Sequence, residues 1–208
     1  MVTKRFEREW VRGWLHEPAA PSQKSLVITH GAGSNCDSLL LVAIAEAFAG
    51  AGFHALRCDL PFRQERPAGP PLRSAERDRE GLERAVQAMR EIVSGPLILG
   101  GHSYGGRQST MLATEHPGLA DMLLLLAYPL HPPRKPEQLR TQHLVQLQTP
   151  ALFLHGARDP FGTPGEMEAA LAAIPARHHL FTLENTGHEW NAATAPVILR
   201  ETLCFVSV

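Results

Sequence analysis

The sequence predicts an α/β fold in which a doubly wound, mostly parallel sheet is covered by helices on both faces. From about residue 25 onward, short apolar runs alternate with segments of helical periodicity. Such alternation requires a parallel sheet with helices packed on each side. Residues 6–16 differ, because charged and apolar residues roughly alternate there, which is typical of one or two antiparallel strands at a sheet edge. A length of 208 residues fits one domain covering 1–208.

Short apolar runs that end at glycine, proline or a polar residue mark the buried strands. These strands are expected at residues 25–30, 54–60, 96–100, 121–130, 151–155 and 179–183. Helical periodicity, with capping residues at the ends, marks the segments between and after them. The helices are expected from Asp37 or Ser38 to Gly50, and at 74–93, 103–115, 163–174 and 194–205.

Two of these helices carry specific local signals. Thr163-Pro164-Gly165-Glu166 forms a capping box with proline at the first helical position. In the segment 74–93, five apolar residues fall on one stripe, as expected for a helix that packs on a sheet: Leu82, Ala85, Val86, Met89 and Val93. Between Pro61 and about Leu72 the chain is rich in proline, glycine and arginine, which predicts a polar loop.

Charge and composition exclude several classes of protein. The 20 Lys and Arg residues balance 21 Asp and Glu residues, so we expect neither nucleic acid nor an anionic membrane as a partner. No apolar run approaches the roughly 20 residues of a membrane span, and the charged N-terminus does not resemble a signal peptide. Three widely spaced cysteines fit neither a disulfide framework nor a zinc site. We therefore expect a cytoplasmic protein with no metal and no organic cofactor.

A candidate nucleophile lies in Gly101-His102-Ser103-Tyr104-Gly105, which matches G-x-S-x-G. The motif falls between a predicted strand and a predicted helix. A sharp turn at this point exposes the serine oxygen, and the glycines let the backbone approach without a Cβ clash. The alternative is a glycine-rich turn that only packs the strand against the helix.

A serine hydroxyl needs a base, and the base needs an acid that orients it. In a sheet of this kind the expected chain order is serine, acid and histidine. Asp159 follows the strand at 151–155, and His188 follows the last strand. Both lie just beyond the carboxyl ends of strands, where a doubly wound sheet places its site. Asp159 could instead only initiate a turn, since Pro160 follows it.

The loop after the first buried strand, Thr29-His30-Gly31-Ala32-Gly33, is suited to an oxyanion hole. The backbone N–H groups of Tyr104 and Ala32 are the expected donors, with Gly33 as the alternate. The alternative is an ordinary glycine-rich turn from strand to helix.

Together these motifs resemble the α/β-hydrolase superfamily from Ser25 to the C-terminus. The similarity extends to small dienelactone-hydrolase-like enzymes, and further to a compact group that includes a testis-expressed protein and a subunit of a histone-acetyltransferase complex. The stretches that suggest this group are Asp59-Leu60-Pro61-Phe62-Arg63, Tyr128-Pro129-Leu130-His131-Pro132-Pro133 and Arg158-Asp159-Pro160-Phe161-Gly162. Dienelactone hydrolases proper use a cysteine where this chain has Ser103. The resemblance implies the fold and the triad, but not dienelactone as the substrate.

Only about twenty residues separate the strand ending near Leu130 from the strand beginning at Ala151, which predicts a minimal or absent lid and an open site. Several residues are expected to contact substrate: His30, His102, Arg63, Arg107, His131, Arg140, His143 and Phe161. The arginines among them suggest a substrate with a carboxylate or phosphate. Alternatively they are solvated, or pair with acids such as Asp59 and Glu137.

The sequence thus predicts a serine hydrolase that cleaves a small carboxylic ester or thioester through an acyl-enzyme. Ser103 is the expected nucleophile, His188 the general base and Asp159 its orienting acid. Two alternatives stay open. The same residues can act on a lactone, amide or C–C bond, or the chain is a non-catalytic interaction module on the same fold. The oligomeric state is not predicted.

Overall fold

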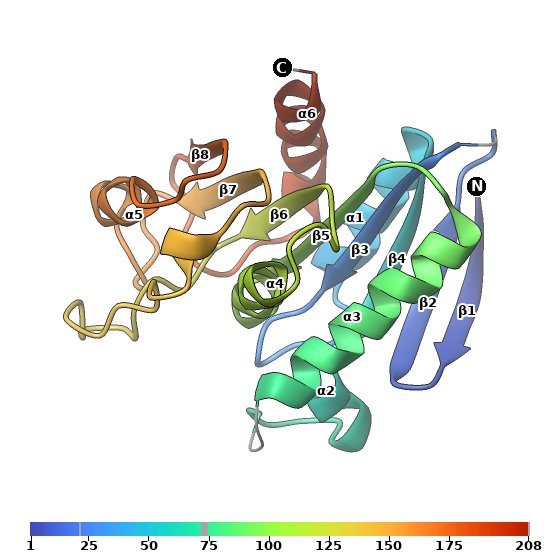
Figure 1. Ribbon diagram of the computed structural model, residues 1–208, viewed down its shortest axis with the longest axis horizontal. Coiled ribbons are helices and arrows are strands. Elements are labelled where there is room, and N and C mark those ends of the chain that lie inside the picture. The colour runs from blue at the N-terminus through green and yellow to red at the C-terminus, as the bar shows by residue number, and fades with distance from the viewer. Residues whose placement is uncertain (21, 72–74, 208) are drawn as a thin grey trace.

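The computed structural model describes residues 1–20, 22–71 and 75–207. Its centre is an eight-stranded sheet in the order β1-β2-β4-β3-β5-β6-β7-β8 (Figure 1). The strands are β1 (Val2–Arg8), β2 (Val11–Glu17), β3 (Lys24–Thr29), β4 (Phe53–Asp59), β5 (Leu97–His102), β6 (Met122–Leu126), β7 (Ala151–Gly156) and β8 (His178–Leu183). From β4 to β8 across the sheet all pairings are parallel, whereas β2 pairs antiparallel with both β1 and β4. This arrangement confirms the predicted mostly parallel sheet with an antiparallel N-terminal edge.

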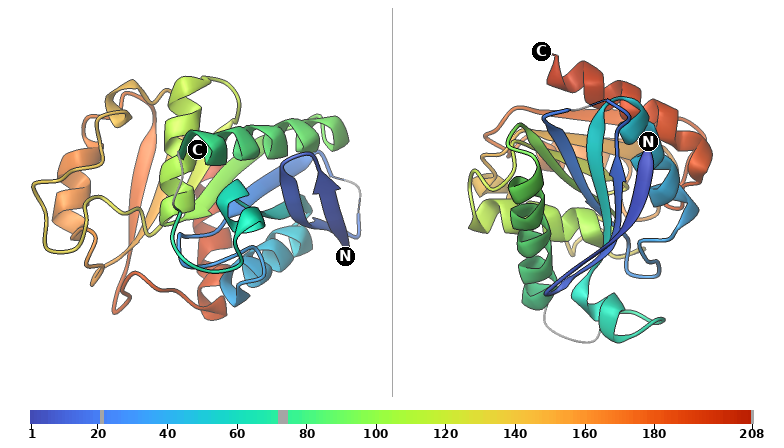
Figure 2. Two further views of the ribbon diagram at one scale, coloured as in Figure 1. Left: turned by 90° about the horizontal axis from the view of Figure 1, so that it is seen from below. Right: turned by 90° about the vertical axis from the view of Figure 1, so that its right-hand side faces the viewer.

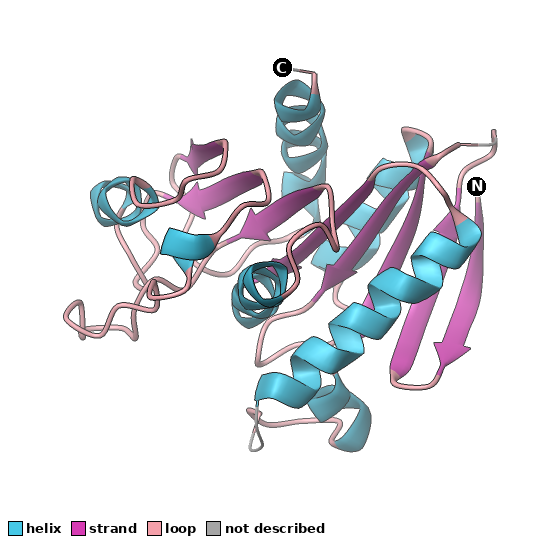
Figure 3. Ribbon diagram, viewed as in Figure 1, coloured by secondary structure: helices cyan, strands magenta, loops and turns pink. Residues whose placement is uncertain are grey.

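Helices cover both faces of the sheet (Figures 2 and 3). They are α1 (Leu39–Gly50), α2 (Pro61–Glu65), α3 (Ala75–Ile92), α4 (Tyr104–Glu115), α5 (Pro164–Leu171) and α6 (Ala195–Val206), with short 3-10 turns at Leu144–Gln146 and Ala192–Thr194. Helices α1 and α6 pack on one face, and α3 and α4 pack on the other (Figure 2). The side chains of Ser38 and Thr163 cap α1 and α5, as their sequence signals predict.

Alternation along the strands supplies an apolar layer to each face of the sheet. In β5, Leu97 and Leu99 belong to the layer under α3 and α4, while Ile98 belongs to the layer under α1 and α6. Successive strand residues point to opposite faces, so a strand covered on both sides must be apolar at every position. The sequence of β6 meets that requirement at every position, whereas β5 is buried throughout but ends in Gly100, Gly101 and the polar His102.

The carboxyl ends of the parallel strands meet at one edge of the sheet. Strand order reverses at β3, which lies between β4 and β5. In open α/β sheets, ligands bind outside the carboxyl ends of the strands at such a reversal. The loops that leave β3, β5, β7 and β8 at this edge are those that carry the predicted site.

Two segments differ from the sequence prediction for local reasons. A short helix, α2, occupies the start of the predicted polar loop, because Pro61 favours a first helical turn and the N–H of Phe62 donates to Asp78 Oδ1 at 3.0 Å. Strand β6 ends at Leu126 rather than at residue 130, because Ala127 adopts a left-handed backbone with φ 49°. The predicted helix start at Ser74 and loop end at Leu72 lie outside the described residues.

No cap domain is present in the connection between β6 and β7, all of which the structure describes. Residues 127–150 contain a single 3-10 turn, Leu144–Gln146, and otherwise run as a loop. The carboxyl edge of the sheet is therefore not covered by a large lid. Among the described helices, none has both the length and the hydropathy needed to cross a membrane.

Replacing Phe153 with alanine tests the core on the α3 and α4 face. Phe153 is fully buried in β7 and packs edge-to-face on Tyr128, with ring centroids 5.8 Å apart. We expect Phe153→Ala to lower the free energy of unfolding by about 3–5 kcal/mol in urea denaturation, since it removes a large buried ring and leaves a cavity. Ile92→Ala, on an exposed side chain of α3, is the control and should change it by less than about 0.5 kcal/mol. A loss below about 1 kcal/mol for Phe153→Ala would contradict the packing.

Candidate active site

Ser103 sits in a strained turn between β5 and α4. Its backbone adopts φ 51° and ψ −114°, a conformation that costs energy for a residue with a side chain. The turn is tight on both sides. A Cβ at Gly101 would lie 2.5 Å from the carbonyl carbon of Gly105, and a Cβ at Gly105 would lie 2.6 Å from the carbonyl oxygen of His30. Glycine is required at both positions, and the serine side chain projects from the carboxyl edge of the sheet.

Three side chains from three loops meet at this edge in a continuous line of hydrogen bonds. His188 Nε2 lies 2.8 Å from Ser103 Oγ, and His188 Nδ1 lies 2.8 Å from Asp159 Oδ2. A carboxylate only accepts, so Nδ1 carries the proton and Nε2 is free to accept the serine hydroxyl. Asp159 is buried, and its other oxygen accepts the N–H of Phe161 at 2.8 Å. This geometry can transfer the serine proton to imidazole and stabilise the imidazolium that forms.

Contacts with His102 and Trp190 hold the loop that carries His188. His102 Nε2 donates to the carbonyl oxygen of His188 at 2.9 Å. Burial lowers the pKa of His102, and the charge of the neighbouring His188 lowers it further. Trp190 packs edge-to-face on His102, with centroids 6.2 Å apart, and donates to the carbonyl of Gly187. The ring of Phe161 lies 4.1 Å from that of His188, and the ring of His102 lies 5.5 Å from it. The imidazole thus contacts two aromatic rings.

A cavity of about 390 Å³ opens at Ser103. It is lined by Gly31, Ala32, Gly33, Ser34, His102, Ser103, Phe161, His188 and Glu189. A second cavity of about 280 Å³ adjoins it toward the first turn of α1 and Trp190, and is also lined by His30. Glu189 lines both cavities, and the sequence does not predict this position. Nothing in its sequence context distinguishes it from other exposed carboxylates, because only the turn after β8 places it there.

The predicted oxyanion donors flank this cavity. Ala32 and Gly33 line it, and Tyr104, the first residue of α4, follows the serine directly. Within the described residues, no acceptor is bonded to the backbone N–H of Ala32, Gly33 or Tyr104. The Tyr104 side chain turns away and donates to Asp78 Oδ2 at 2.7 Å. Burial and this bond raise the pKa of Tyr104, so the phenol stays protonated.

The remaining predicted substrate-binding residues fall into two groups. His102, Phe161 and His30 line the two cavities. Arg63, in contrast, is buried beneath the loop after β3, and its guanidinium bonds backbone carbonyls. The others lie around the connection between β6 and β7 and do not line either cavity: Arg107, His131, Arg140 and His143.

Each histidine of the connection between β6 and β7 has a local partner. His131 Nδ1 donates to the carbonyl of Pro132 at 2.8 Å, and His143 Nε2 lies 2.8 Å from Thr110 Oγ1. Burial lowers the pKa of His143 to about 4, with a further contribution from the charge of Arg107. In the described part of the chain, no cluster of three or more His, Cys, Asp or Glu side chains is arranged to hold a metal ion.

A mostly parallel sheet with a serine at the turn after β5, followed in the chain by Asp159 and His188, has the architecture of the α/β-hydrolase class. The family model described as Alpha/beta hydrolase domain matches residues 22–197, and the chain belongs to that family. It is therefore an α/β-hydrolase, as the motifs predict.

Solved structures support the same fold. TT1662 from Thermus thermophilus is 23% identical, covers 100% of this chain and 98% of its own, and has a TM-score of 0.77. A dienelactone hydrolase from Anabaena variabilis is 20% identical over 95% of this chain and 91% of its own, with a TM-score of 0.75. Est1E from Butyrivibrio proteoclasticus is 14% identical over 99% of both chains, with a TM-score of 0.76. At these identities the likeness establishes the fold alone.

Neutral buried histidines should make stability depend on pH. Burial lowers the pKa of His16, His30 and His143 to about 4, against 6.5 for a free side chain. Below pH 6.5 the unfolded chain binds these protons and the folded chain does not. The contribution of these neutral histidines to the free energy of unfolding is therefore fully present above pH 6.5 and is lost as the pH falls toward 4. We expect the free energy of unfolding, measured by urea denaturation, to decline between pH 7 and pH 5.5.

His143→Asn isolates one of these groups. It should reduce the decline between pH 7 and pH 5.5, because one depressed pKa is removed. His179→Asn, at an exposed position in β8, is the matched control and should leave the decline unchanged. If His143→Asn and His179→Asn gave the same pH dependence as the wild type, His143 would not be held neutral by burial.

Proposed function

We propose that the protein is a serine hydrolase that cleaves a carboxylic ester or thioester through an acyl-enzyme. Ser103 attacks the acyl carbon, and His188 accepts its proton and passes it to the leaving group. Asp159 fixes the imidazole tautomer and stabilises the imidazolium. Water then attacks the acyl-enzyme by the same route. The observation that carries this proposal is the pair of 2.8 Å contacts linking Ser103, His188 and Asp159.

The negative charge that develops on the carbonyl oxygen needs N–H donors. In this proposal the amide of Tyr104 is one donor, since it follows the nucleophile at the N-terminus of α4. The second is the amide of Ala32, with Gly33 as the alternate, on the loop that lines the cavity. The backbone N–H groups of Tyr104, Ala32 and Gly33 have no acceptor among the described residues, so they are free to bind the oxyanion.

The size of the site favours small substrates. The cavity at Ser103 measures about 390 Å³, and no cap domain lies over it in the described chain. Similar structures have been solved with small molecules, including Est1E with ferulic acid and DcsB with its substrate analogue. Drug-sized ligands occupy pockets of this order. A small acyl group with a flexible leaving group fits this volume.

Ser103→Ala tests the nucleophile. We expect the wild type to hydrolyse p-nitrophenyl acetate and to be labelled by a fluorophosphonate probe. Ser103→Ala should lose both, with at least about a 10³-fold fall in kcat, because the attacking oxygen is gone. Ser94→Ala, an exposed serine beside β5, is the control and should retain full activity.

Circular dichroism of Ser103→Ala should match the wild type, so that lost turnover reports chemistry rather than folding. Turnover retained by Ser103→Ala would overturn the assignment of the nucleophile. A wild type that is neither labelled nor active on a panel of esters, thioesters, lactones and amides would instead favour a non-catalytic module.

A second part of the proposal is that the substrate carries a negative charge. Arg107 lies one helical turn beyond Ser103, about 5.4 Å along the axis of α4. Its Nε is buried and makes no hydrogen bond within the described chain. Among the described residues, the only hydrogen bond of the Arg140 side chain is one of 3.5 Å to the carbonyl of Pro129. The pKa of Arg140 is lowered by burial and by the charge of Arg107. Neither arginine pairs with a carboxylate among the described residues.

Two half-buried guanidinium groups with no counter-ion in the part of the chain that the structure describes favour an anion between them. The hydroxyl of Tyr128, just after β6, donates to the backbone carbonyl of Arg140 at 2.8 Å and so holds the backbone at that residue. We therefore assign to Arg107 and Arg140, which lie outside the two cavities, the binding of a carboxylate on the part of the substrate that extends beyond the cavity at Ser103. The preferred substrate would be an ester of a dicarboxylic acid rather than a simple fatty ester.

A pair of esters of equal length tests this assignment. We expect the wild type to prefer mono-p-nitrophenyl adipate over p-nitrophenyl hexanoate. Arg107→Gln and Arg140→Gln should each lower kcat/KM for the adipate by about tenfold, the magnitude of one charge-assisted hydrogen bond, and leave the hexanoate within twofold. Lys135→Gln, an exposed cation of the same loop, is the control. Equal losses on both esters would refute the anion site without affecting the nucleophile.

A further inference from the structure

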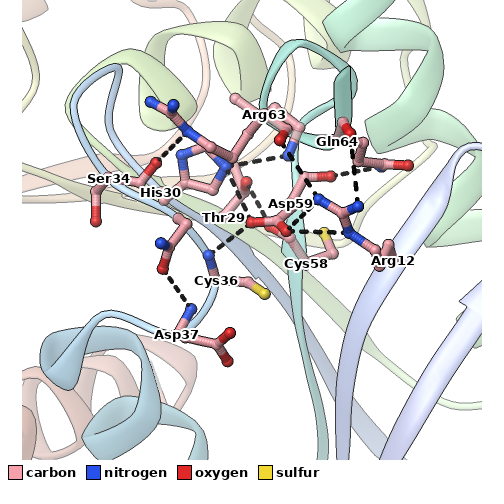
Figure 4. Close-up of polar contacts among 12 residues, drawn as sticks. Arg12, Thr29, His30, Ser34, Cys36, Asp37, Cys58, Asp59, Arg63 and Gln64 are labelled. Carbon is pink, nitrogen blue, oxygen red and sulfur yellow. Dashed lines mark hydrogen bonds and ion pairs between the residues drawn. The ribbon is translucent and has the colours of Figure 1, made fainter. Parts of the chain in front are cut away.

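The loop of residues 30–36 forms one wall of the cavity at Ser103 but contains no helix or strand. Its backbone is nevertheless held at several points by buried side chains from β4 and α2 (Figure 4). The N–H of Cys36 donates to Asp59 Oδ1 at 2.8 Å, and Arg57 donates to the carbonyl of Cys36 at 2.6 Å. These contacts fix the far end of the loop, where it enters α1.

Arg63 holds the part of the loop next to the nucleophile. Its Nε donates to the carbonyl of Ser34 and one Nη to the carbonyl of Ala32, both at 2.7 Å. Two further N–H groups donate to the carbonyls of Gly69 at 3.0 Å and Arg66 at 3.2 Å. The side chain is only 3% exposed. A buried guanidinium with four of its five N–H donors bonded to backbone carbonyls organises the chain around it, and Arg63 does not line the cavity.

His30 holds the carbonyl of Gly31, the residue before Ala32. Its Nδ1 lies 2.8 Å from the carbonyl oxygen of Gly31, and its Nε2 accepts the N–H of Leu60 at 3.1 Å. Nδ1 therefore carries the proton, and the ring is neutral, in agreement with a pKa that burial lowers to about 4. The N–H of Ser34 also donates to the carbonyl of Gly31, at 3.1 Å.

The planarity of the peptide bond turns these contacts into a constraint on the amides. The peptide bonds of the loop are trans, so each C=O points opposite to the N–H of the next residue. His30 holds the carbonyl of Gly31, which directs the N–H of Ala32 to the other side. Arg63 holds the carbonyl of Ala32, which directs the N–H of Gly33 away from the buried guanidinium. Both N–H groups are left without an acceptor in the described chain.

We infer that Arg63 is a positioning residue for the oxyanion hole. It holds the carbonyls of Ala32 and Ser34, so the peptide unit between Ala32 and Gly33 cannot rotate the N–H of Gly33, the alternate donor, away from the cavity. The same bond to the carbonyl of Ala32 restricts rotation of the backbone at Ala32, whose own N–H is the other candidate donor. His30 performs the same task for the peptide unit before it. This inference rests on the proposed function, since it assigns to these amides the stabilisation of the charge formed during attack by Ser103.

The test is the kinetics of Arg63→Gln with p-nitrophenyl acetate. Loss of one aligned oxyanion donor lowers kcat by about 10²–10³-fold in other hydrolases, so a donor that is misaligned part of the time should cost about 10- to 100-fold. KM should stay within about threefold, because the amides bind the transition state and not the ground state. A boronic acid that mimics the tetrahedral intermediate should bind Arg63→Gln more weakly by a similar factor.

Arg57→Gln provides the matched control. Arg57 is also buried and also holds a carbonyl of this loop, but at Cys36, beyond the candidate donors. We expect it to lower the melting temperature as Arg63→Gln does, while kcat and boronic acid affinity stay within about threefold of the wild type. This comparison separates positioning of the amides from a general loosening of the loop.

Two further measurements cover the case in which Arg63→Gln folds poorly. Arg63→Lys keeps a cation but loses the forked donors, so it should fold and still lose kcat. Guanidinium at millimolar concentration should restore part of the kcat of Arg63→Ala, and should not affect Ser103→Ala. An unchanged kcat in folded Arg63→Lys and Arg63→Gln would overturn the inference, as would an equal loss in Arg57→Gln.

The outcome for Arg63 is distinguishable from that for the nucleophile. If wild-type turnover persists in Ser103→Ala, the proposed function fails, and the positioning role of Arg63 that rests on it fails too. If Ser103→Ala is inactive and the Arg63 variants are fully active, the proposed function stands and the positioning role of Arg63 is refuted.

Discussion

The left-handed backbone of Ser103 is the constraint on which the site depends. A residue with a side chain adopts φ 51° only when the surrounding structure compensates for the strain. Here β5 fixes one side and α4 the other, and the N–H of Ser103 donates to the carbonyl of Leu126 at 2.8 Å. The chain can turn this sharply because Gly101 and Gly105 remove the Cβ atoms that would collide. The strained turn in return raises the hydroxyl toward His188.

The sheet determines which loops can meet at that serine. Since β3, β5, β7 and β8 run parallel, their following loops leave at one edge. Asp159 and His188 are 29 residues apart in the chain, yet neighbouring strands bring them within 2.8 Å. The hydrogen-bond line therefore follows from topology, and the packed layers of the core keep the strands in the register that aligns it.

The sequence predicts those features that have a periodic or positional signature. Strand and helix order, the turn at Ser103 and the loops of Asp159 and His188 follow from apolar runs and glycine positions. The place of Arg63 does not. The sequence shows a cation in a proline-rich loop, which predicts a solvated or substrate-facing charge. Pro61 instead starts the short helix α2, which turns the guanidinium inward to backbone carbonyls. Glu189 has no sequence signal because its place depends on the turn after β8.

The loops around an open site are stabilised by contacts with the interior of the protein. The connection between β6 and β7 forms no cap domain that would contact the loops around Ser103. The loop after β3 is held from the interior by charged side chains, chiefly Arg57, Asp59 and Arg63. Burying these charges is costly unless every donor and acceptor is satisfied. The backbone of an irregular loop supplies those partners, so the same contacts that stabilise the buried charges also fix the loop.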